Sequence, residues 1–224
     1  ELGSIKMTQY NTILFDLDGT ISDSAPGIVN SVLYALDKLG LPAGDRNDLK
    51  KFVGPPLYES FRKYYKLSDS ETENAVKYFR EYYQRSGIME NDMYPGIPEL
   101  LEALRGMNKT LIVATSKPEP FAIQILERYG IASYFTYIAG SSLDETRTKK
   151  DEVIAYALET NHITDKSQTV MIGDRSHDIM GAKKNDLPCI GVLYGYGDRP
   201  ELENAGVTHI VETVDDLKSF FTGL

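Results

Sequence analysis

An apolar segment that ends in two closely spaced aspartates constrains this chain more than any other feature. Ile13-Leu14-Phe15 has the composition of a buried strand, and Asp16-Leu17-Asp18-Gly19-Thr20 follows it directly. Side chains two residues apart in an extended chain point to the same side, so both carboxylates face one site. Such crowded negative charge is typical of a divalent-cation site, and these ligands suit a hard, oxygen-ligated ion such as Mg²⁺. Gly19 permits a sharp turn where a ligand approaches, and Thr20 offers a hydroxyl and a backbone N–H to a phosphate oxygen.

Three further segments carry polar residues at the ends of apolar runs or at helix starts. Leu111-Ile112-Val113-Ala114-Thr115-Ser116 reads as a strand that ends in hydroxyl residues. Lys149-Lys150 opens an amphipathic helix. Val170-Met171-Ile172-Gly173-Asp174 is an apolar strand ending in Gly-Asp, and a second aspartate, Asp178, follows one helical turn later. A short motif alone is weak evidence, but four in one order are specific.

These four segments resemble, in order, the motifs of the haloacid dehalogenase-like (HAD) phosphohydrolases, and the resemblance extends over nearly the whole chain. It implies an α/β fold, with a HAD-like Rossmannoid core in which a parallel sheet lies between helices. It also implies a small all-helical cap domain inserted after the first strand. The expected reaction is Mg²⁺-dependent hydrolysis of a small phosphate ester through an aspartyl-phosphate intermediate.

The resemblance implies a role for each motif residue. Asp16 would be the nucleophile, and Asp18 would protonate the leaving alkoxide and then activate water. Thr115 would bind the phosphate, and Lys150 would neutralise its charge. The metal ligands would be Asp16, the backbone carbonyl of Asp18, and Asp174. The expected substrate-binding residues are Gly19, Thr20, Ser116 and Lys117, with Asp178 in a supporting role.

Some of these assignments have alternatives at the level of sequence. Asp178 is also placed to stabilise a helix start through the helix dipole. Because two lysines are adjacent, the active-site lysine is either Lys149 or Lys150. Arg175 stands where a serine or threonine is common in this motif, although a nucleotidase-like group has Gly-Asp-Arg-x-x-Asp there. His177 is interpreted as a surface or helix-start residue, because no His/Cys cluster indicates zinc.

Strand and helix patterns alternate along most of the 224 residues. The predicted strands are 12–16, 110–114, 134–139, 169–172, 188–193 and 209–211. The predicted helices of this part are 97–105, 118–129, 151–159, 176–184 and 214–220. Residues 7–21 and 93–224 are therefore assigned to the α/β core, and residues 1–6 to an expression-tag remnant.

Residues 22–92 lack a strand pattern and are assigned to the cap. The predicted cap helices are 26–39, 45–52, 56–65 and 70–85, with a capping box at Ser70-x-x-Glu73. The cap is rich in tyrosine, and the helical spacing of Tyr78/Tyr82 and Phe79/Tyr83 favours packing within the cap. The break before Tyr58, at residues 54–57, is the expected place for substrate contacts.

Composition restricts the partners of the chain. A net charge of −9 disfavours binding to nucleic acid polymers, and no apolar stretch is long enough to cross a bilayer. The single cysteine, Cys189, lies in an apolar run and is expected to be a buried structural thiol. These features suggest a reducing cytoplasm. The expected partner is a small-molecule phosphate ester, and the expected assembly is a monomer or a homodimer, between which the sequence does not decide.

The motifs also distinguish members of the superfamily. Dehalogenases lack the second aspartate of the first motif, so Asp18 argues against that activity. The chain looks like the phosphoglycolate phosphatase group, and within it like a 5′-nucleotidase-like branch, because of Gly173–Asp178 and the glycine-tyrosine loop Gly191–Gly197. A phosphomutase of the same superfamily is the alternative enzyme. A HAD-fold binding module without catalysis is disfavoured, since a residue is present for every catalytic role.

Overall fold

A six-stranded parallel sheet forms the centre of the computed structural model, which describes residues 10–224. The expected tag remnant, residues 1–6, lies outside the described residues. The strand order is β5-β4-β1-β6-β7-β8, which places β1 between β4 and β6. The strands are β1 (Thr12–Phe15), β4 (Thr110–Pro118), β5 (Tyr137–Ser141), β6 (Thr169–Gly173), β7 (Cys189–Val192) and β8 (His209–Val211).

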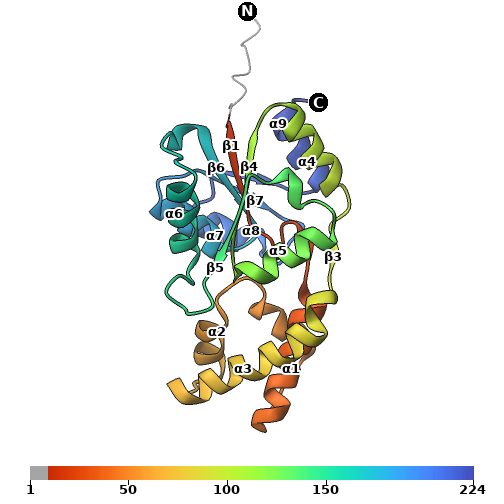
Figure 1. The fold of residues 1–224 in the computed structure, drawn as a ribbon, viewed down its shortest axis with the longest axis vertical. Helices are drawn as coiled ribbons and strands as arrows, with labels where there is room; N and C mark the ends of the chain where they lie inside the picture. The colour runs from red at the N-terminus through yellow and green to blue at the C-terminus, as the bar shows by residue number, and fades with distance from the viewer. Residues whose placement is uncertain (1–9) are drawn as a thin grey trace, which may run out of the picture.

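Helices cover both faces of this sheet, which confirms the predicted α/β class (Figure 1). One face packs against α4 (Ile97–Gly106), α5 (Glu119–Arg128) and α9 (Val214–Thr222). The other face packs against α6 (Lys150–Thr160), α7 (Ser176–Lys184) and α8 (Arg199–Ala205). The alternation of side chains along β1 produces these two cores, because Ile13 and Phe15 enter the first and Leu14 enters the second.

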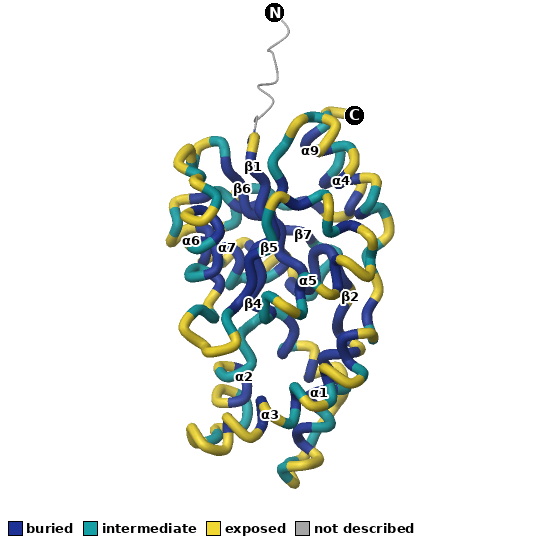
Figure 2. The backbone as a smooth tube through the Cα atoms, viewed as in Figure 1, coloured by how far each residue is buried: buried dark blue, intermediate teal, exposed yellow. Residues whose placement is uncertain are grey.

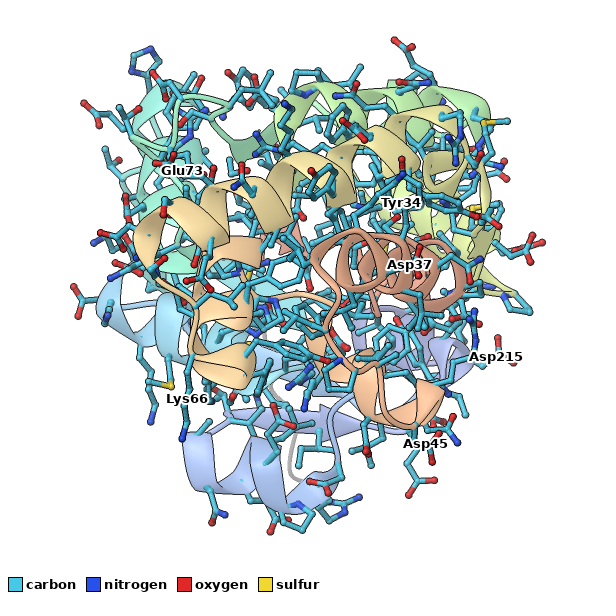
Figure 3. The ribbon with its side chains drawn as sticks, turned by 90° about the horizontal axis from the view of Figure 1, so that it is seen from below. Tyr34, Asp37, Asp45, Lys66, Glu73 and Asp215 are labelled. Atoms are coloured by element: carbon cyan, nitrogen blue, oxygen red, sulfur yellow. The ribbon has the colours of Figure 1, made fainter. Side chains whose placement is uncertain are left out.

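The segment between β1 and β4 is largely helical and lies beyond the carboxyl ends of the strands, away from both termini (Figure 1). It contains α1 (Ala25–Leu39), the 3-10 helix η1 (Arg46–Phe52), α2 (Leu57–Tyr65), α3 (Asp69–Arg85) and the 3-10 helix η2 (Gly87–Met89). A short antiparallel pair, β2 (Ser22–Asp23) with β3 (Asp92–Met93), joins its two ends. Figure 3 shows α3 crossing the end of the molecule, with Glu73 near one end of the helix and Tyr34 of α1 toward the other. We call residues 22–92 the helical insert.

The helical insert has an apolar interior that is continuous with one of the two sheet cores. Phe52 and Phe61 are almost fully buried, and their rings lie 5.0 Å apart. Figure 2 shows the buried residues on the inner sides of the insert helices and the exposed residues on their outer sides. The insert therefore packs against the core as part of one hydrophobic unit.

Several local predictions differ from the observed elements. The expected capping box at Ser70 is wrong: Ser68 caps α3, and its Oγ accepts from Glu71 N at 3.3 Å. Ser68 has the extended backbone that an N-cap needs, whereas Ser70 already lies inside the helix. The predicted helix 45–52 is a 3-10 helix, and the expectation of no strand in the insert misses β2 and β3 at its two ends.

In the core, the strand predicted at 134–139 begins later, at Tyr137, because residues 132–134 form a 3-10 turn. The helix α8 was not predicted; it is only seven residues long and contributes one buried residue, Leu202.

Cys189 is buried in β7, as expected for a structural thiol. Within residues 10–224 no helix has both the length and the apolar character needed to cross a bilayer.

Candidate active site

The residues of the four sequence motifs meet at the carboxyl ends of β1, β4 and β6. Asp16 directly follows β1, and its N–H continues the ladder by donating to Ile172 O of β6 at 2.9 Å. Asp174 follows β6, while Thr115 belongs to β4 on the other side of β1. Parallel strands bring their carboxyl ends to one edge, so residues distant in sequence are gathered there.

Lys150 is the cation at the centre of this cluster. Its Nζ lies 2.7 Å from Asp16 Oδ1 and 3.0 Å from Asp178 Oδ1, and it donates to Ala114 O at 3.1 Å. Lys150 is 4 % exposed, whereas Lys149 is exposed at the start of α6 and makes no such contact. Burial opposes the charge of Lys150, but Asp16 and Asp178 raise its pKa, so it stays an ammonium. The structure thus resolves the ambiguity between the two lysines in favour of Lys150.

Asp178 is held in place by the turn between β6 and α7. Its Oδ2 accepts from the backbone N–H groups of Asp174 and Arg175, both at 3.1 Å. Burial would raise the pKa of Asp178, but the positive charge of Lys150 and the hydrogen bonds from Lys150 and from Arg175 N–H are among the opposing effects that together lower this pKa below its usual value. Asp178 is therefore a permanent anion that orients Lys150 toward Asp16.

Asp16 and Asp174 lie in a buried environment in which Lys150 offsets the negative charge of Asp16, Asp174 and Asp178 only in part. Asp16 Oδ2 is buried and has no hydrogen-bond partner, although Oδ1 accepts from Lys150 and from Leu17 N. Burial raises the pKa of Asp16 well above its usual value, and the charges of Asp178 and Asp174 add to this. Burial, followed by the charge of Asp178, raises the pKa of Asp174 to about 7. Such carboxylates are arranged to receive a cation.

The backbone packs tightly around Asp174. Gly19 has φ +86°, and a Cβ at this position would lie 2.1 Å from Asp174 Oδ2. The glycine-tyrosine loop approaches from the other side, where Tyr196 N donates to Asp174 Oδ2 at 2.8 Å. A Cβ on Gly195 would lie 2.3 Å from Asp174 Cβ, and one on Gly197 would lie 2.1 Å from Asp174 O. These glycines are needed for the close approach, and Thr20 Oγ1 completes the enclosure with a hydrogen bond to Asp174 Oδ1 at 3.4 Å.

Carboxylate and imidazole atoms of Asp16, His177 and Asp178 also approach within 4.8 Å of one another. The ammonium of Lys150 already lies between the two carboxylates of this group, so a second cation there would be repelled. The free Oδ2 of Asp16 and the buried carboxylate of Asp174 remain as groups able to ligate a metal ion. The buried acidic cluster of the described residues therefore fits a cation.

Asp18 is linked to the helical insert through Lys117. Lys117 Nζ lies 3.4 Å from Asp18 Oδ1 and donates to the hydroxyl of Tyr83 on α3 at 2.6 Å. Tyr83 stacks on Phe79 with ring centroids 5.7 Å apart, which confirms the predicted packing role of this pair. Tyr83 has a second role that its sequence position does not indicate, which is its contact with the site. Helical spacing predicts that Tyr83 packs on Phe79 within its own helix, but it gives no information about Lys117, which belongs to a distant part of the chain.

The hydroxyl residues at the end of β4 are also close to the motif aspartates. Thr115 Oγ1 accepts from Lys117 N at 3.1 Å, and Ser116 Oγ is buried without a hydrogen-bond partner. Helix α5 begins only at Glu119, after an extended Pro118, so Ser116 and Lys117 lie on extended backbone before the helix. An unpaired buried hydroxyl beside Asp18 and Lys117 is able to donate to a bound anion.

Arg175 and His177 form the contact between the core and the loop after η1. Arg175 Nε donates to Glu201 Oε1 at 2.9 Å, and Arg175 Nη1 donates to Val53 O at 3.2 Å. A Cβ on Gly54 would lie 2.8 Å from His177 Cε1, so the loop rests directly on this ring. Burial lowers the pKa of His177 to about 4, which leaves the imidazole neutral at pH 7.

This fold and site define a class of enzyme. The chain belongs to the haloacid dehalogenase-like hydrolase family, whose model matches residues 13–192, and within that family it is a phosphatase. The resemblance inferred from the four motifs is thereby confirmed.

Individual relatives place the chain more closely. A 5′-nucleotidase of Pseudomonas aeruginosa is 44% identical, with 90% of each chain covered. A protein named tyrosine-protein kinase PtkA from Mycobacterium tuberculosis is 39% identical, with 92% of this chain and 70% of the relative covered. The crystal structure of a protein described as a predicted phosphatase from Clostridium acetobutylicum has a TM-score of 0.93 at 47% identity, covering 96% of this chain and 99% of that one. Phosphoglycolate phosphatases of Vibrio species are more distant, at 28% and 32% identity.

Proposed function

We propose that the protein is a Mg²⁺-dependent phosphomonoester hydrolase that works through an aspartyl-phosphate on Asp16. The observation that carries this proposal is the environment of Asp16, whose Oδ1 is paired with Lys150 at 2.7 Å while Oδ2 is buried and free. An anionic nucleophile and an anionic ester repel each other, so a site of this kind must supply positive charge at the point of attack. Lys150 supplies one charge.

The chain's own residues are suited to two successive transfers. In the first, a carboxylate oxygen of Asp16 attacks phosphorus in line, the bond to the leaving oxygen breaks, and Asp18 gives that oxygen a proton. In the second, Asp18 takes a proton from water as the water oxygen attacks the phosphorus. The bond to Asp16 then breaks and inorganic phosphate leaves. Asp18 is two residues from Asp16 and is also buried, which suits an acid and base that acts on the same reacting centre.

Three groups would hold Mg²⁺: Asp16, Asp174 and the backbone carbonyl of Asp18. The free Oδ2 of Asp16 and the raised pKa of Asp174 support this ligand set, since both reflect buried negative charge that Lys150 offsets only in part. When bound, the ion would offset the charge of the phosphoryl oxygens. Asp178 would keep Lys150 oriented.

The phosphate itself would be bound by groups around Asp16. Thr115, Ser116 and Lys117 approach from the end of β4, while Gly19 and Thr20 approach from the turn after β1. Ser116 Oγ has no partner in the described residues and is therefore free to donate to a phosphoryl oxygen. We assign the phosphate-binding role to these five residues together.

Residues 22–92 would act as a cap over the core formed by residues 7–21 and 93–224. The insert is joined to the core by the paired segments β2 and β3, which is the arrangement of a hinge. Lys117–Tyr83 and Arg175–Val53 are the contacts that would hold it closed.

The substrate class is a small phosphate ester. A nucleoside 5′-monophosphate is supported by the name of the relative at 44% identity, and 2-phosphoglycolate by the names of more distant relatives. The residues of the core contact the phosphate, so discrimination between these esters depends on the insert.

Release of inorganic phosphate with Mg²⁺ tests the reaction. The panel comprises p-nitrophenyl phosphate, nucleoside 5′-monophosphates, 2-phosphoglycolate and sugar phosphates. Turnover is expected to require Mg²⁺, to stop with EDTA, and to fall roughly 1000-fold or more in Asp16→Asn. Asp37→Asn on the exposed side of α1 is the matched control. Equal activity in Asp16→Asn contradicts the proposal, and isomerisation of a sugar phosphate without phosphate release indicates a mutase.

A further inference from the structure

A small cavity lies between the helical insert and the core, next to Asp18. Its free space is about 50 Å³, and its floor includes Asp18, Ser116 and Lys117. Its walls are mostly apolar and aromatic, formed by Phe52, Phe79, Tyr83 and Phe121. The part of the substrate that leaves with the ester oxygen would extend from Asp18 into this space.

One cation reaches this cavity without a counter-ion. Arg80 of α3 lines it, and the Nε of Arg80 is buried with no hydrogen-bond partner. Glu145 lines a neighbouring cavity together with Arg80, but no carboxylate within residues 10–224 lies within 4.0 Å of the guanidinium.

Three other cations of the site each have an acidic partner. Lys117 lies beside Asp18, Lys150 between Asp16 and Asp178, and Arg175 against Glu201. The Nε of Arg80 is buried at this mostly apolar wall without a hydrogen-bond partner, so it has lost hydration without compensation, and a charged partner would offset that loss. Among the cations that line this cavity within residues 10–224, Arg80 is thus the one with unused binding capacity.

We propose that Arg80 determines substrate specificity by binding a carboxylate on a small leaving group. This inference rests on the proposed phosphatase function and adds the chemistry of the group attached to the phosphate. A carboxylate matches the planar donor pattern of a guanidinium, and the apolar walls strengthen the ion pair by lowering the local dielectric constant. A free space of about 50 Å³ suits a leaving group of a few heavy atoms.

The size of the cavity argues against a nucleoside as the preferred leaving group. A base and a ribose need several times this volume, so the insert would have to withdraw and give up contacts such as that between Lys117 and Tyr83. The aromatic walls would otherwise suit a flat base, and a guanidinium is also able to donate to base acceptors. The experiment must therefore distinguish a carboxylate from a base edge.

Matched pairs of esters make this distinction. 2-Phosphoglycolate and 2-hydroxyethyl phosphate differ in the carboxylate, and AMP and ribose 5-phosphate differ in the base. Values of kcat/KM are measured for all four in the wild type, Arg80→Met and Arg80→Lys. Arg85→Met is the control, because Arg85 is an exposed arginine on the same helix that lies over Tyr34 and Tyr82.

The expected result is a preference for 2-phosphoglycolate over 2-hydroxyethyl phosphate that falls roughly 10- to 100-fold in Arg80→Met, is partly retained in Arg80→Lys and is unchanged in Arg85→Met. The proposal is overturned if the ratio stays the same in Arg80→Met, or if that variant loses only the preference for AMP over ribose 5-phosphate. Asp16-dependent hydrolysis of p-nitrophenyl phosphate in the same preparations shows separately whether the phosphatase function holds.

Discussion

Arg175 of the core donates a hydrogen bond from Nη1 to the backbone carbonyl oxygen of Val53 in the helical insert, at 3.2 Å. The same guanidinium is anchored by Glu201 at 2.9 Å, and its backbone N–H is bound by Asp178. Arg175 therefore connects the turn that carries Asp174 and Asp178 to the loop after η1, which contains Val53 and lines the cavity next to Asp18. The departure of Arg175 from the more common serine or threonine of this motif has a structural consequence, which is a direct link between the motif and the insert.

Loss of this link should weaken substrate binding. We expect Arg175→Met to raise KM for the best ester roughly tenfold, because a hydrogen bond from a charged donor contributes about 1.5 kcal/mol to keeping the insert closed. Steady-state kinetics of the wild type and the variant provide the measurement. Arg199→Met is the control, since Arg199 is half-exposed and makes only long surface ion pairs at 3.7 and 3.8 Å. An unchanged KM in Arg175→Met would contradict this role.

The two adjacent lysines should behave very differently. Lys150→Met is expected to lower kcat/KM by roughly 100- to 1000-fold, because it removes the charge beside Asp16. It should also lower the free energy of unfolding by about 3 kcal/mol or more, because Asp16 and Asp178 lose their buried partner. Lys149→Met should change stability by less than about 0.5 kcal/mol. Urea unfolding and steady-state kinetics of both variants provide the measurement. Similar effects in Lys149→Met and Lys150→Met would refute the assignment of Lys150 as the active-site lysine.

A methyl group at Gly19 should disturb the cation site. The Cβ of Gly19→Ala would overlap Asp174 Oδ2, and the positive φ of +86° adds backbone strain. Because displacement of a site residue by about 1 Å has a large kinetic effect, we expect Mg²⁺-dependent activity to fall roughly 100-fold. Gly40→Ala is a matched control with φ +68° and no atom within 4 Å of its Cβ. It should lose about 1 kcal/mol of stability and keep its activity, whereas equal activity losses would show that backbone strain alone is responsible.

Burial of His177 should make stability depend on pH. The unfolded chain takes up a proton near pH 6.5, but the folded protein does so only near its lowered pKa of about 4. As the pH is lowered, the unfolded state therefore binds the proton before the folded state does. The contribution of His177 to the free energy of unfolding is complete above pH 6.5 and is lost as the pH falls toward 4. Between pH 7 and pH 5 the wild type should lose about 2 kcal/mol more than His177→Gln. Urea unfolding at both pH values tests this, and parallel losses in the two proteins would rule it out.

Much of the fold follows from local sequence patterns. The apolar run before Asp16, the strand before Asp174 and the helix after Lys149 were predicted because their periodicity and end signals are strong. The misplaced cap of α3 shows where this reasoning fails, since Ser68 and Ser70 both precede an acidic residue by three positions. Only the backbone conformation at Ser68 distinguishes them.

Contacts across the cleft could not be predicted in the same way. Tyr83 was expected to pack on Phe79, and it does, yet its hydroxyl also meets Lys117 from β4. Nothing in the sequence marks Arg80 as a substrate-binding residue, because arginines are common on helices. That its Nε lacks a hydrogen-bond partner is visible only in the folded structure. Both residues come from the insert, whose placement against the core depends on interactions distant in sequence.

The sequence by itself determined the class of fold and the identity of the motif aspartates, because carboxylates at strand ends follow from alternation and from the parallel order of the strands. Three features are visible only in the folded protein: which lysine faces Asp16, how Gly19, Gly195 and Gly197 enclose Asp174, and that Arg80 lines the cavity beside Asp18 with its Nε unpaired. Those outcomes depend on distances between residues far apart in the chain. Local periodicity carries no information about such distances, since it specifies only which face of its own element a side chain occupies.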